Sequence, residues 1–139
     1  MTSDEPRRAL LDTSVLIDFP GVQVAQVADE VAVSAVTIAE LHYGVAAATD
    51  PLTQMARPRR VPATLDRFEV LSFDVSAAEY YGALAGLVRR RGRDSRPRRM
   101  DLQIAATAAR HGLTLLTRNG SDFTGLESAL AVVALPDDP

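Results

Sequence analysis

Four acidic residues stand where strands are expected to end or helices to begin: Asp12, Glu40, Asp101 and Asp122. The first interrupts "ALLDTSVLID", in which a strand-like apolar run stops at a carboxylate and then resumes. Carboxylates within a few ångströms of one another raise one another's pKa values unless a cation neutralises their charge. If the fold brings these four together, we expect them to bind a divalent metal ion.

The composition indicates which metal this would be. The chain has no Cys and only two His, and we interpret His42 and His111 as structural or surface residues on helices. A site with oxygen ligands alone favours Mg²⁺, with Mn²⁺ as a substitute, over Zn²⁺. Because Mg²⁺ binds a few carboxylates together with substrate phosphate, the expected reaction is phosphodiester hydrolysis by metal-activated water.

Each acid also has a structural interpretation. Asp12 and Asp101 stand where helices are expected to begin, so either could cap a helix or interact with its dipole. Glu40 follows Thr37 by three residues, which is the spacing of a capping box, and Asp122 in "NGSDF" could be a turn residue. A parallel sheet, however, would bring all four positions to one edge, which makes coincident capping the weaker explanation.

Small polar residues next to these acids could orient a carboxylate, a water molecule or a phosphate oxygen. Equally, they could be ordinary caps and turns. They are Thr13, Ser14, Thr117 and Asn119.

Strand-like and helix-like segments alternate along the chain, which predicts a mostly parallel α/β sheet covered on both faces. We expect strands at 8–11, 31–34, 69–73, 113–117 and 130–135. We expect helices at 14–19, 22–30, 37–48, 63–68, 74–91 and 100–112, with Ser76 as an N-cap, Gly112 as a C-cap, and a proline-containing surface loop over 49–62.

The length of 139 residues predicts a single domain over residues 1–139. The longest apolar stretch, "ALAVVAL" at 129–135, is far too short to cross a bilayer, and the N-terminus carries no targeting pattern. Together with the absence of Cys, this leads us to expect a cytoplasmic protein.

Positive charge is concentrated in one segment. All fifteen basic residues are Arg, and "RRRGRDSRPRR" at 89–99 has a net charge of +6, whereas the rest of the chain sums to −9. This segment could bind RNA phosphates through Arg96, Arg98 and Arg99, immediately before Asp101. It could equally be a solvated loop, and the sequence leaves both interpretations open.

The ordered motifs "LLDTSVLID", "SAVTIAELHYG" and "MDLQIAATAARHGLTLLTRNGSDF" resemble the PIN-domain ribonucleases, most closely the VapC toxins of bacterial toxin–antitoxin pairs. The resemblance covers nearly the whole chain. It depends on the order of Asp-Thr-Ser, a helical Glu with Gly44 four residues later, Asp-x-x-Ile-Ala, and Thr-x-Asn-x-x-Asp-Phe. On this match the four acids take the family's acidic positions, and Thr117 and Asn119 take its polar positions.

The resemblance implies a PIN-like three-layer α/β/α fold, with a parallel sheet of four to five strands in the order 3-2-1-4-5. It also implies an Mg²⁺- or Mn²⁺-dependent endoribonuclease toxin of a type II toxin–antitoxin system. Its expected partners are an RNA substrate, a cognate VapB-like antitoxin that covers the acids, and a second copy of the chain in a homodimer.

Other function classes fit less well. A noncatalytic PIN-like module that binds RNA or protein is the main alternative, and the retained acids argue against it. A phospho-aspartate receiver is disfavoured because the chain contains no Lys. No Gly-rich phosphate loop follows the first expected strand, which disfavours an enzyme with a nucleotide cofactor.

Overall fold

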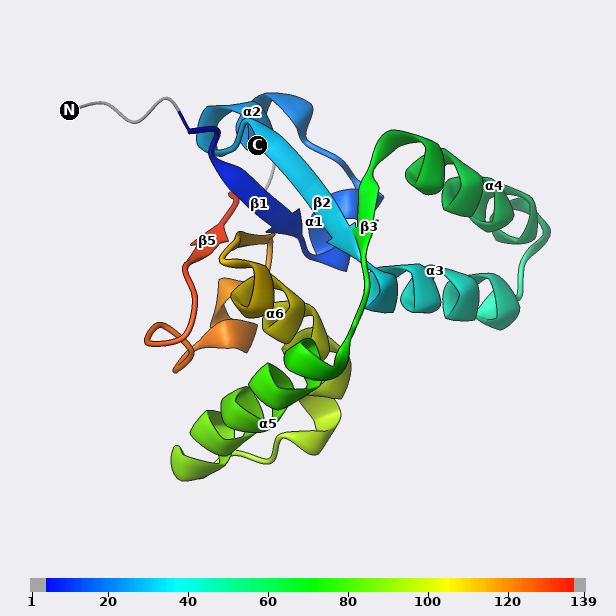
Figure 1. Ribbon diagram of the computed structural model, residues 1–139. Helices are drawn as coiled ribbons and strands as arrows, with labels where there is room; N and C mark the ends of the chain where they lie inside the picture. Colours follow the sequence, from blue (N-terminus) through cyan, green and yellow to red (C-terminus); the bar gives the residue numbers. More distant parts are fainter. Residues whose placement is uncertain (1–4, 137–139) are drawn as a thin grey trace.

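The computed structural model describes residues 5–136 and contains a five-stranded sheet flanked by helices (Figure 1). The strands have the order β3-β2-β1-β4-β5, and every neighbouring pair is parallel. The predicted order and parallel pairing are therefore confirmed. The strands are β1 (Arg8–Leu11), β2 (Glu30–Ser34), β3 (Glu69–Leu71), β4 (Thr114–Thr117) and β5 (Val132–Ala134).

Helices cover both faces of this sheet. The α-helices are α1 (Thr13–Ile17), α2 (Gly21–Val27), α3 (Ala35–Ala47), α4 (Pro51–Arg67), α5 (Val75–Arg90) and α6 (Arg99–His111). Two short 3₁₀ helices, η1 (Arg96–Arg98) and η2 (Gly120–Phe123), precede α6 and follow β4.

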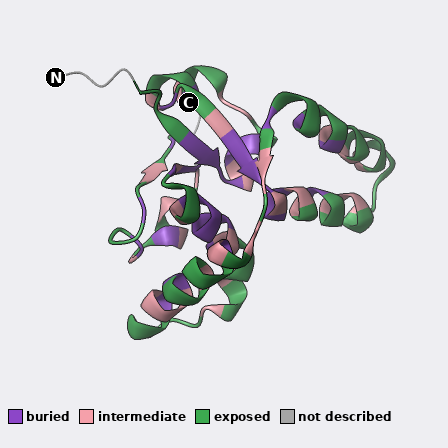
Figure 2. Ribbon diagram, in the orientation of Figure 1, coloured by how far each residue is buried: buried purple, intermediate pink, exposed green. Residues whose placement is uncertain are grey.

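Consecutive residues of β1 belong to two different cores. Leu10 packs in a buried cluster with Leu84 of α5 and Leu102 of α6, whereas Leu11 packs in a second cluster with Val15 of α1. Successive side chains of a strand point to opposite faces, so an unbroken apolar run is what a strand covered on both sides requires. Buried residues accordingly concentrate in the strands and on the inner faces of the helices (Figure 2).

The register of the central strands brings their carboxyl ends together. Leu11 is aligned with Val33 of β2 and with Leu116 of β4. The residues that follow these positions are Asp12, Ser34 and Thr117, and the Asp12 amide donates to the Leu116 carbonyl at 2.8 Å. The parallel fold thus places Asp12 at the sheet edge where ligands usually bind.

The prediction of a loop over 49–62 is wrong, because this segment forms most of α4. Asp50 caps the helix, and Pro51 occupies its first turn, where a missing amide hydrogen breaks no helical hydrogen bond. Pro58 and Pro62 lie inside the helix, where each normally costs about 3 kcal/mol. Local proline preferences indicated a loop, but tertiary packing outweighs them.

That packing comes from a helical hairpin in which α3 and α4 lie side by side (Figure 1). Val61 of α4 is buried in the core beside Phe68, and the Arg57 guanidinium donates to the Gly44 carbonyl of α3 at 2.6 Å. Val61 shares its buried cluster with Leu116 of β4, which is distant in sequence, so local patterns alone did not indicate this packing.

Two predicted helix caps have different outcomes. Gly112 ends α6 in the left-handed region, with φ of +65°, as expected for a glycine C-cap. Ser76 is not an N-cap, because Asp74 takes this role and accepts a hydrogen bond from the Ala77 amide at 2.8 Å. Within residues 5–136, no helix is both long and apolar enough to traverse a membrane.

Candidate metal-binding active site

Asp12 is the buried centre of a hydrogen-bond network at the end of β1, with 5% of its surface exposed. Its Oδ1 accepts from the Thr13 amide at 2.9 Å, which caps α1. Its Oδ2 accepts from the Ser14 hydroxyl at 3.0 Å and from the Thr117 hydroxyl at 2.8 Å. The capping interpretation of Asp12 is therefore confirmed, and three donors also fix its carboxylate in one orientation.

Glu40 approaches the same network from α3. The Thr13 hydroxyl donates to Glu40 Oε1 at 2.8 Å, and its oxygen lies 3.0 Å from the Thr37 hydroxyl. Because Thr13 gives its single hydrogen to Glu40, Thr37 must donate to Thr13. The sequence pattern did not indicate this role for Thr37, since its buried position beside Thr13 depends on how α3 packs on α1.

The predicted capping box between Thr37 and Glu40 is wrong. Ser34 caps α3, and its hydroxyl accepts from the Val36 amide at 3.0 Å. Burial raises the pKa of Glu40, the hydrogen bond from Thr13 opposes this, and the charge of Asp12 raises it further.

Asp101 links all four acids electrostatically. It lies in the first turn of α6 and is half-buried. Burial is the main reason its pKa rises from 3.8 to about 6, and the charges of Asp12, Asp122 and Glu40 add to this rise. The nearby Arg98 lowers the pKa. Negative charge from four separate chain segments is therefore concentrated around Asp101.

Asp122, in η2, is paired with a positive side chain. Arg98 Nη1 lies 3.1 Å from Asp122 Oδ1 and donates to the Asp122 carbonyl oxygen at 2.8 Å. Asn119, at the start of the same turn, is exposed, and its backbone amide donates to the Thr117 hydroxyl at 3.0 Å. Asn119 thus connects to Asp12 through its main chain and Thr117.

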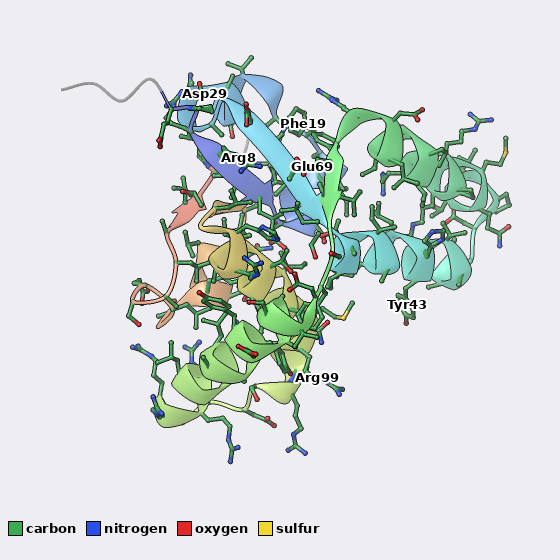
Figure 3. All side chains as sticks on the ribbon, viewed as in Figure 1. Arg8, Phe19, Asp29, Tyr43, Glu69 and Arg99 are labelled. Carbon is green, nitrogen blue, oxygen red and sulfur yellow. The ribbon has the colours of Figure 1, made fainter. Side chains whose placement is uncertain are left out.

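The Arg-rich segment 89–99 divides between the end of α5, a turn and η1. Of the three arginines predicted to bind RNA, Arg98 turns toward Asp122, whereas Arg96 pairs with Asp94 at 3.1 Å. Arg99 is exposed at the start of α6 (Figure 3). Their role in RNA binding stays a prediction.

Known proteins with this sequence pattern and this fold identify the family. The PIN domain family model matches residues 9–127. The chain belongs to the PIN-domain family. This PIN domain is 35% identical over 133 residues to Ribonuclease VapC5 of Mycobacterium tuberculosis. The alignment covers 94% of this chain and 96% of that protein. It is also 35% identical over 123 residues to Ribonuclease VapC4 of the same organism, covering 86% of this chain and 92% of that protein.

A solved structure matches most of this PIN domain. It is the crystal structure of VapBC-5, a member of the VapBC family of toxin–antitoxin systems from Mycobacterium tuberculosis. The match has a TM-score of 0.78 and 34% sequence identity, and it covers 95% of this chain and 100% of that chain. The expected PIN-like fold is therefore confirmed.

The acids of this PIN domain fit a hard divalent cation in charge and in ligand type, because all four offer carboxylate oxygens. Within the described residues 5–136, no three His, Cys, Asp or Glu side chains are already arranged to hold a metal ion. Hydrogen bonds from Thr13 and Thr117 and the ion pair with Arg98 hold the carboxylates instead. The fit therefore rests on concentrated negative charge and oxygen donors, not on a preformed cage.

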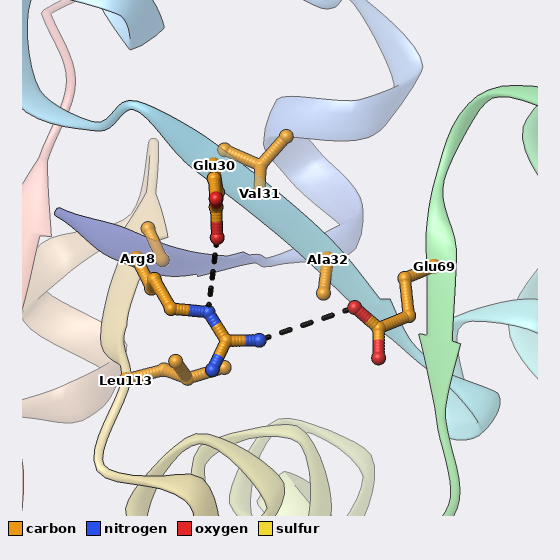
Figure 4. A pocket seen from close by; sticks show the side chains of 7 residues that line it. Arg8, Glu30, Val31, Ala32, Glu69 and Leu113 are labelled. Atoms are coloured by element: carbon orange, nitrogen blue, oxygen red, sulfur yellow. Dashed lines mark ion pairs between the residues drawn. The ribbon is translucent and has the colours of Figure 1, made fainter. Parts of the chain in front are cut away.

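At the opposite edge of the sheet, the described residues form a small pocket around Arg8. There Arg8 spans two neighbouring strands, lying 3.3 Å from Glu30 and 3.9 Å from Glu69 (Figure 4). The pocket they line has a volume of about 20 Å³, which is room for about one water molecule. Arg8 therefore forms ion pairs that connect β1 to Glu30 of β2 and Glu69 of β3.

Proposed function

We propose that this PIN domain is an Mg²⁺-dependent endoribonuclease toxin of a type II toxin–antitoxin system, with Mn²⁺ able to replace Mg²⁺. The observation that carries the proposal is that acids from separate segments converge. Thr13 donates its amide hydrogen to Asp12 and its hydroxyl hydrogen to Glu40, and the charges of Asp12, Glu40 and Asp122 all act on Asp101. Such a concentration of negative charge is stabilised when a divalent cation binds. The VapC relatives are named as ribonucleases, which supports RNA as the substrate.

The four acids would share the work of binding the cation and positioning water. Bound Mg²⁺ supplies a Lewis acid and a water of lowered pKa. Ser14 and Thr117 hold Asp12 Oδ2 in place, and Thr13 holds Glu40 Oε1. Glu40 Oε2 accepts no described hydrogen bond, and the pKa of this carboxyl is raised, so this oxygen is suited to take the proton of an attacking water.

We also propose a VapB-like antitoxin as the partner, and a homodimer as the state of the toxin. The VapBC-5 structure is named as a toxin–antitoxin system, which supports the first part. Large apolar side chains on the α3–α4 hairpin are available to a protein partner: Tyr43, Leu52 and Met55 are 75%, 80% and 60% exposed. Tyr43 points away from α3 into solvent (Figure 3).

The direct test is RNA cleavage by the purified chain in Mg²⁺ and in EDTA, for the wild type, Asp12→Asn and Glu79→Gln. Glu79→Gln is the matched control, because Glu79 is exposed on α5 and is not among the groups that shift the pKa values of Glu40 or Asp101. We expect Mg²⁺-dependent cleavage that Asp12→Asn reduces by more than the roughly 10- to 100-fold typical of residues around a metal site. Cleavage in EDTA that Asp12→Asn leaves unchanged would contradict the proposal, and RNA binding without turnover would favour the noncatalytic module.

A further inference from the structure

A groove leads away from the acids between α1 and the α3–α4 hairpin. The hollow nearest the acids has a volume of about 220 Å³, and Glu40, Arg57 and Arg60 are among the residues that line it. It adjoins a second hollow of about 160 Å³, lined in part by Arg60, Arg67 and Phe19. Arg60 and Ile17 line both hollows, so together they form one groove, which we call the arginine groove.

The positive side of this groove comes from a single helix. Arg57, Arg60 and Arg67 are three and seven positions apart on α4, a spacing that places side chains on one helix face. Together with Arg59 and the single acid Asp66, they give α4 a net charge of +3. The arginine groove therefore carries positive charge to Glu40, at the border of the acidic site.

None of these guanidinium groups forms an ion pair among the described residues, although the charge of Arg57 contributes to lowering the pKa of Asp50. Arg57 donates to the Gly44 carbonyl, and the Arg67 guanidinium lies 4.4 Å from the Phe19 ring centroid. In the part of the chain that the structure describes, no carboxylate oxygen lies within 4.0 Å of Arg57, Arg60 or Arg67. Their charge is thus available to an anionic ligand.

The Arg-rich segment 89–99 differs in this respect. Arg96 and Arg98 already pair with Asp94 and Asp122, so two of its charges are engaged within the chain. Proteins that bind single-stranded nucleic acid use a positive groove along the backbone, commonly with aromatic rings beside it. The arginine groove has the first feature. Its aromatic rings, Phe19 and Phe68, lie beneath Arg67 and help to hold that guanidinium in place.

We propose that the arginine groove binds the sugar–phosphate backbone of single-stranded RNA next to the bond that is cut, with Arg60 as a central phosphate contact. The proposal rests on the proposed function in one respect, that the acids cleave RNA. Arg60 lines both hollows, and its side chain makes no hydrogen bond or ion pair among the described residues. An RNA strand that lies along α4 from Arg67 to Arg57 would reach Glu40 directly.

The test is fluorescence-anisotropy binding of a labelled, fully 2′-O-methylated single-stranded oligoribonucleotide in EDTA, so that no cleavage occurs. Arg60→Gln removes a charge without removing a described contact, and Arg59→Gln is its control, since Arg59 lies on the same helix and lines neither hollow. We expect Arg60→Gln to weaken binding about three- to tenfold and to reduce the salt slope by about one, and Arg59→Gln to change affinity less than about twofold. Arg57→Gln combined with Arg60→Gln should weaken binding further, with melting temperatures confirming that both variants fold.

Equal effects of Arg60→Gln and Arg59→Gln would overturn the proposal. So would a result in which Arg60→Gln weakens binding of an antitoxin peptide but leaves RNA binding unchanged, because the groove would then hold a protein segment. The binding assay is independent of catalysis. If RNA binding depends on Arg60 but Mg²⁺ elicits no cleavage, the proposed function fails and the groove stands; if cleavage occurs while Arg60→Gln alters neither affinity nor KM, the groove fails.

Discussion

The Thr117 hydroxyl donates a 2.8 Å hydrogen bond to Asp12 Oδ2 across a separation of 105 residues. The two residues follow positions that are paired in neighbouring parallel strands, Leu116 of β4 and Leu11 of β1. Their contact is a direct result of strand register, which sets two polar side chains side by side where the apolar runs end. This hydrogen bond therefore links the fold to the orientation of the most buried acid.

Replacing Thr117 tests the value of this link. Thr117→Val keeps the shape of the side chain but leaves Asp12 Oδ2 with Ser14 as its remaining donor, and it also removes the acceptor of the Asn119 amide. We expect the free energy of unfolding to fall by about 1–2 kcal/mol, and RNA cleavage to fall about 10- to 100-fold. Urea denaturation and cleavage assays measure the two effects.

Thr114→Val is the control for this substitution. Thr114 begins the same strand, is half-buried, and makes no described side-chain hydrogen bond. The free energy of unfolding of Thr114→Val should differ from that of the wild type by no more than about 0.5 kcal/mol. Equal losses from the two variants would show that the Thr117 hydroxyl contributes no more than an ordinary strand residue.

The raised pKa of Asp101 predicts how stability depends on pH without metal. The folded chain holds this proton up to a pKa of about 6, whereas the ordinary value is 3.8. The resulting stabilisation is complete below about pH 4 and is lost as pH rises to about 6. Asp101→Asn carries no such proton, so its stability lacks this dependence on pH. As pH rises from about 4 to about 7.5, the free energy of unfolding of Asp101→Asn should therefore increase by about 1–2 kcal/mol relative to that of the wild type, with solvent screening taken into account.

Chemical denaturation in EDTA at several pH values checks this prediction. Burial also raises the pKa of Glu40, so ionisation of Glu40 should likewise lower the stability of the wild type as pH rises. Asp66→Asn, at an exposed position on α4, is the control for removing an acid elsewhere. A constant difference in stability between the wild type and Asp101→Asn across this range would contradict the assignment of the proton to Asp101.

The ion pair between Arg98 and Asp122 predicts an effect on metal affinity. Arg98 brings positive charge to two of the acids, since it pairs with Asp122 and lowers the pKa of Asp101. Removing this charge with Arg98→Gln should tighten Mn²⁺ binding, measured by calorimetry, by about two- to fivefold. Arg96→Gln, which disrupts the outlying pair with Asp94, should leave Mn²⁺ affinity unchanged. Weaker Mn²⁺ binding by Arg98→Gln would reverse the role assigned to Arg98.

The Arg-rich segment makes a separate prediction about RNA. If Arg96, Arg98 and Arg99 bind phosphates, replacing all three with Ala should weaken RNA binding and flatten its dependence on salt, by up to about three in the slope. Titrations at several salt concentrations measure this slope. An unchanged slope would exclude the phosphate clamp and leave the segment as a solvated surface.

Much of the fold could be predicted from the sequence because local patterns and tertiary structure agree there. Apolar runs such as the one containing Leu10 and Leu11 indicate strands buried on both faces, and parallel strands bring the residues after them to one edge. Asp12 and Thr117 could therefore be selected from their positions at strand ends. Gly112 was predictable for a similar reason, because a left-handed C-cap is a local requirement.

The rest depends on contacts between distant segments. The prolines of α4 indicate a loop locally, and the burial of Val61 in one cluster with Leu116 of β4 becomes evident only in the folded chain. The helix carrying Glu40 begins at Ala35, so the apparent capping box lies inside a helix that Ser34 already caps. Which donors hold the acids could not be predicted either, because these contacts depend on side-chain conformation and on how distant segments pack.

The measurement that tests the central claim most directly is an anomalous difference map from crystals of this chain soaked in Mn²⁺. Binding of the cation by the four acids predicts a peak at ordinary coordination distance, about 2.0–2.5 Å, from carboxylate oxygens of Asp12 and Asp101, with Glu40 and Asp122 around it. The same soak of Asp101→Asn crystals should give no such peak. A wild-type map with no Mn²⁺ peak among these four side chains, or with its strongest peak elsewhere on the chain, would contradict the account.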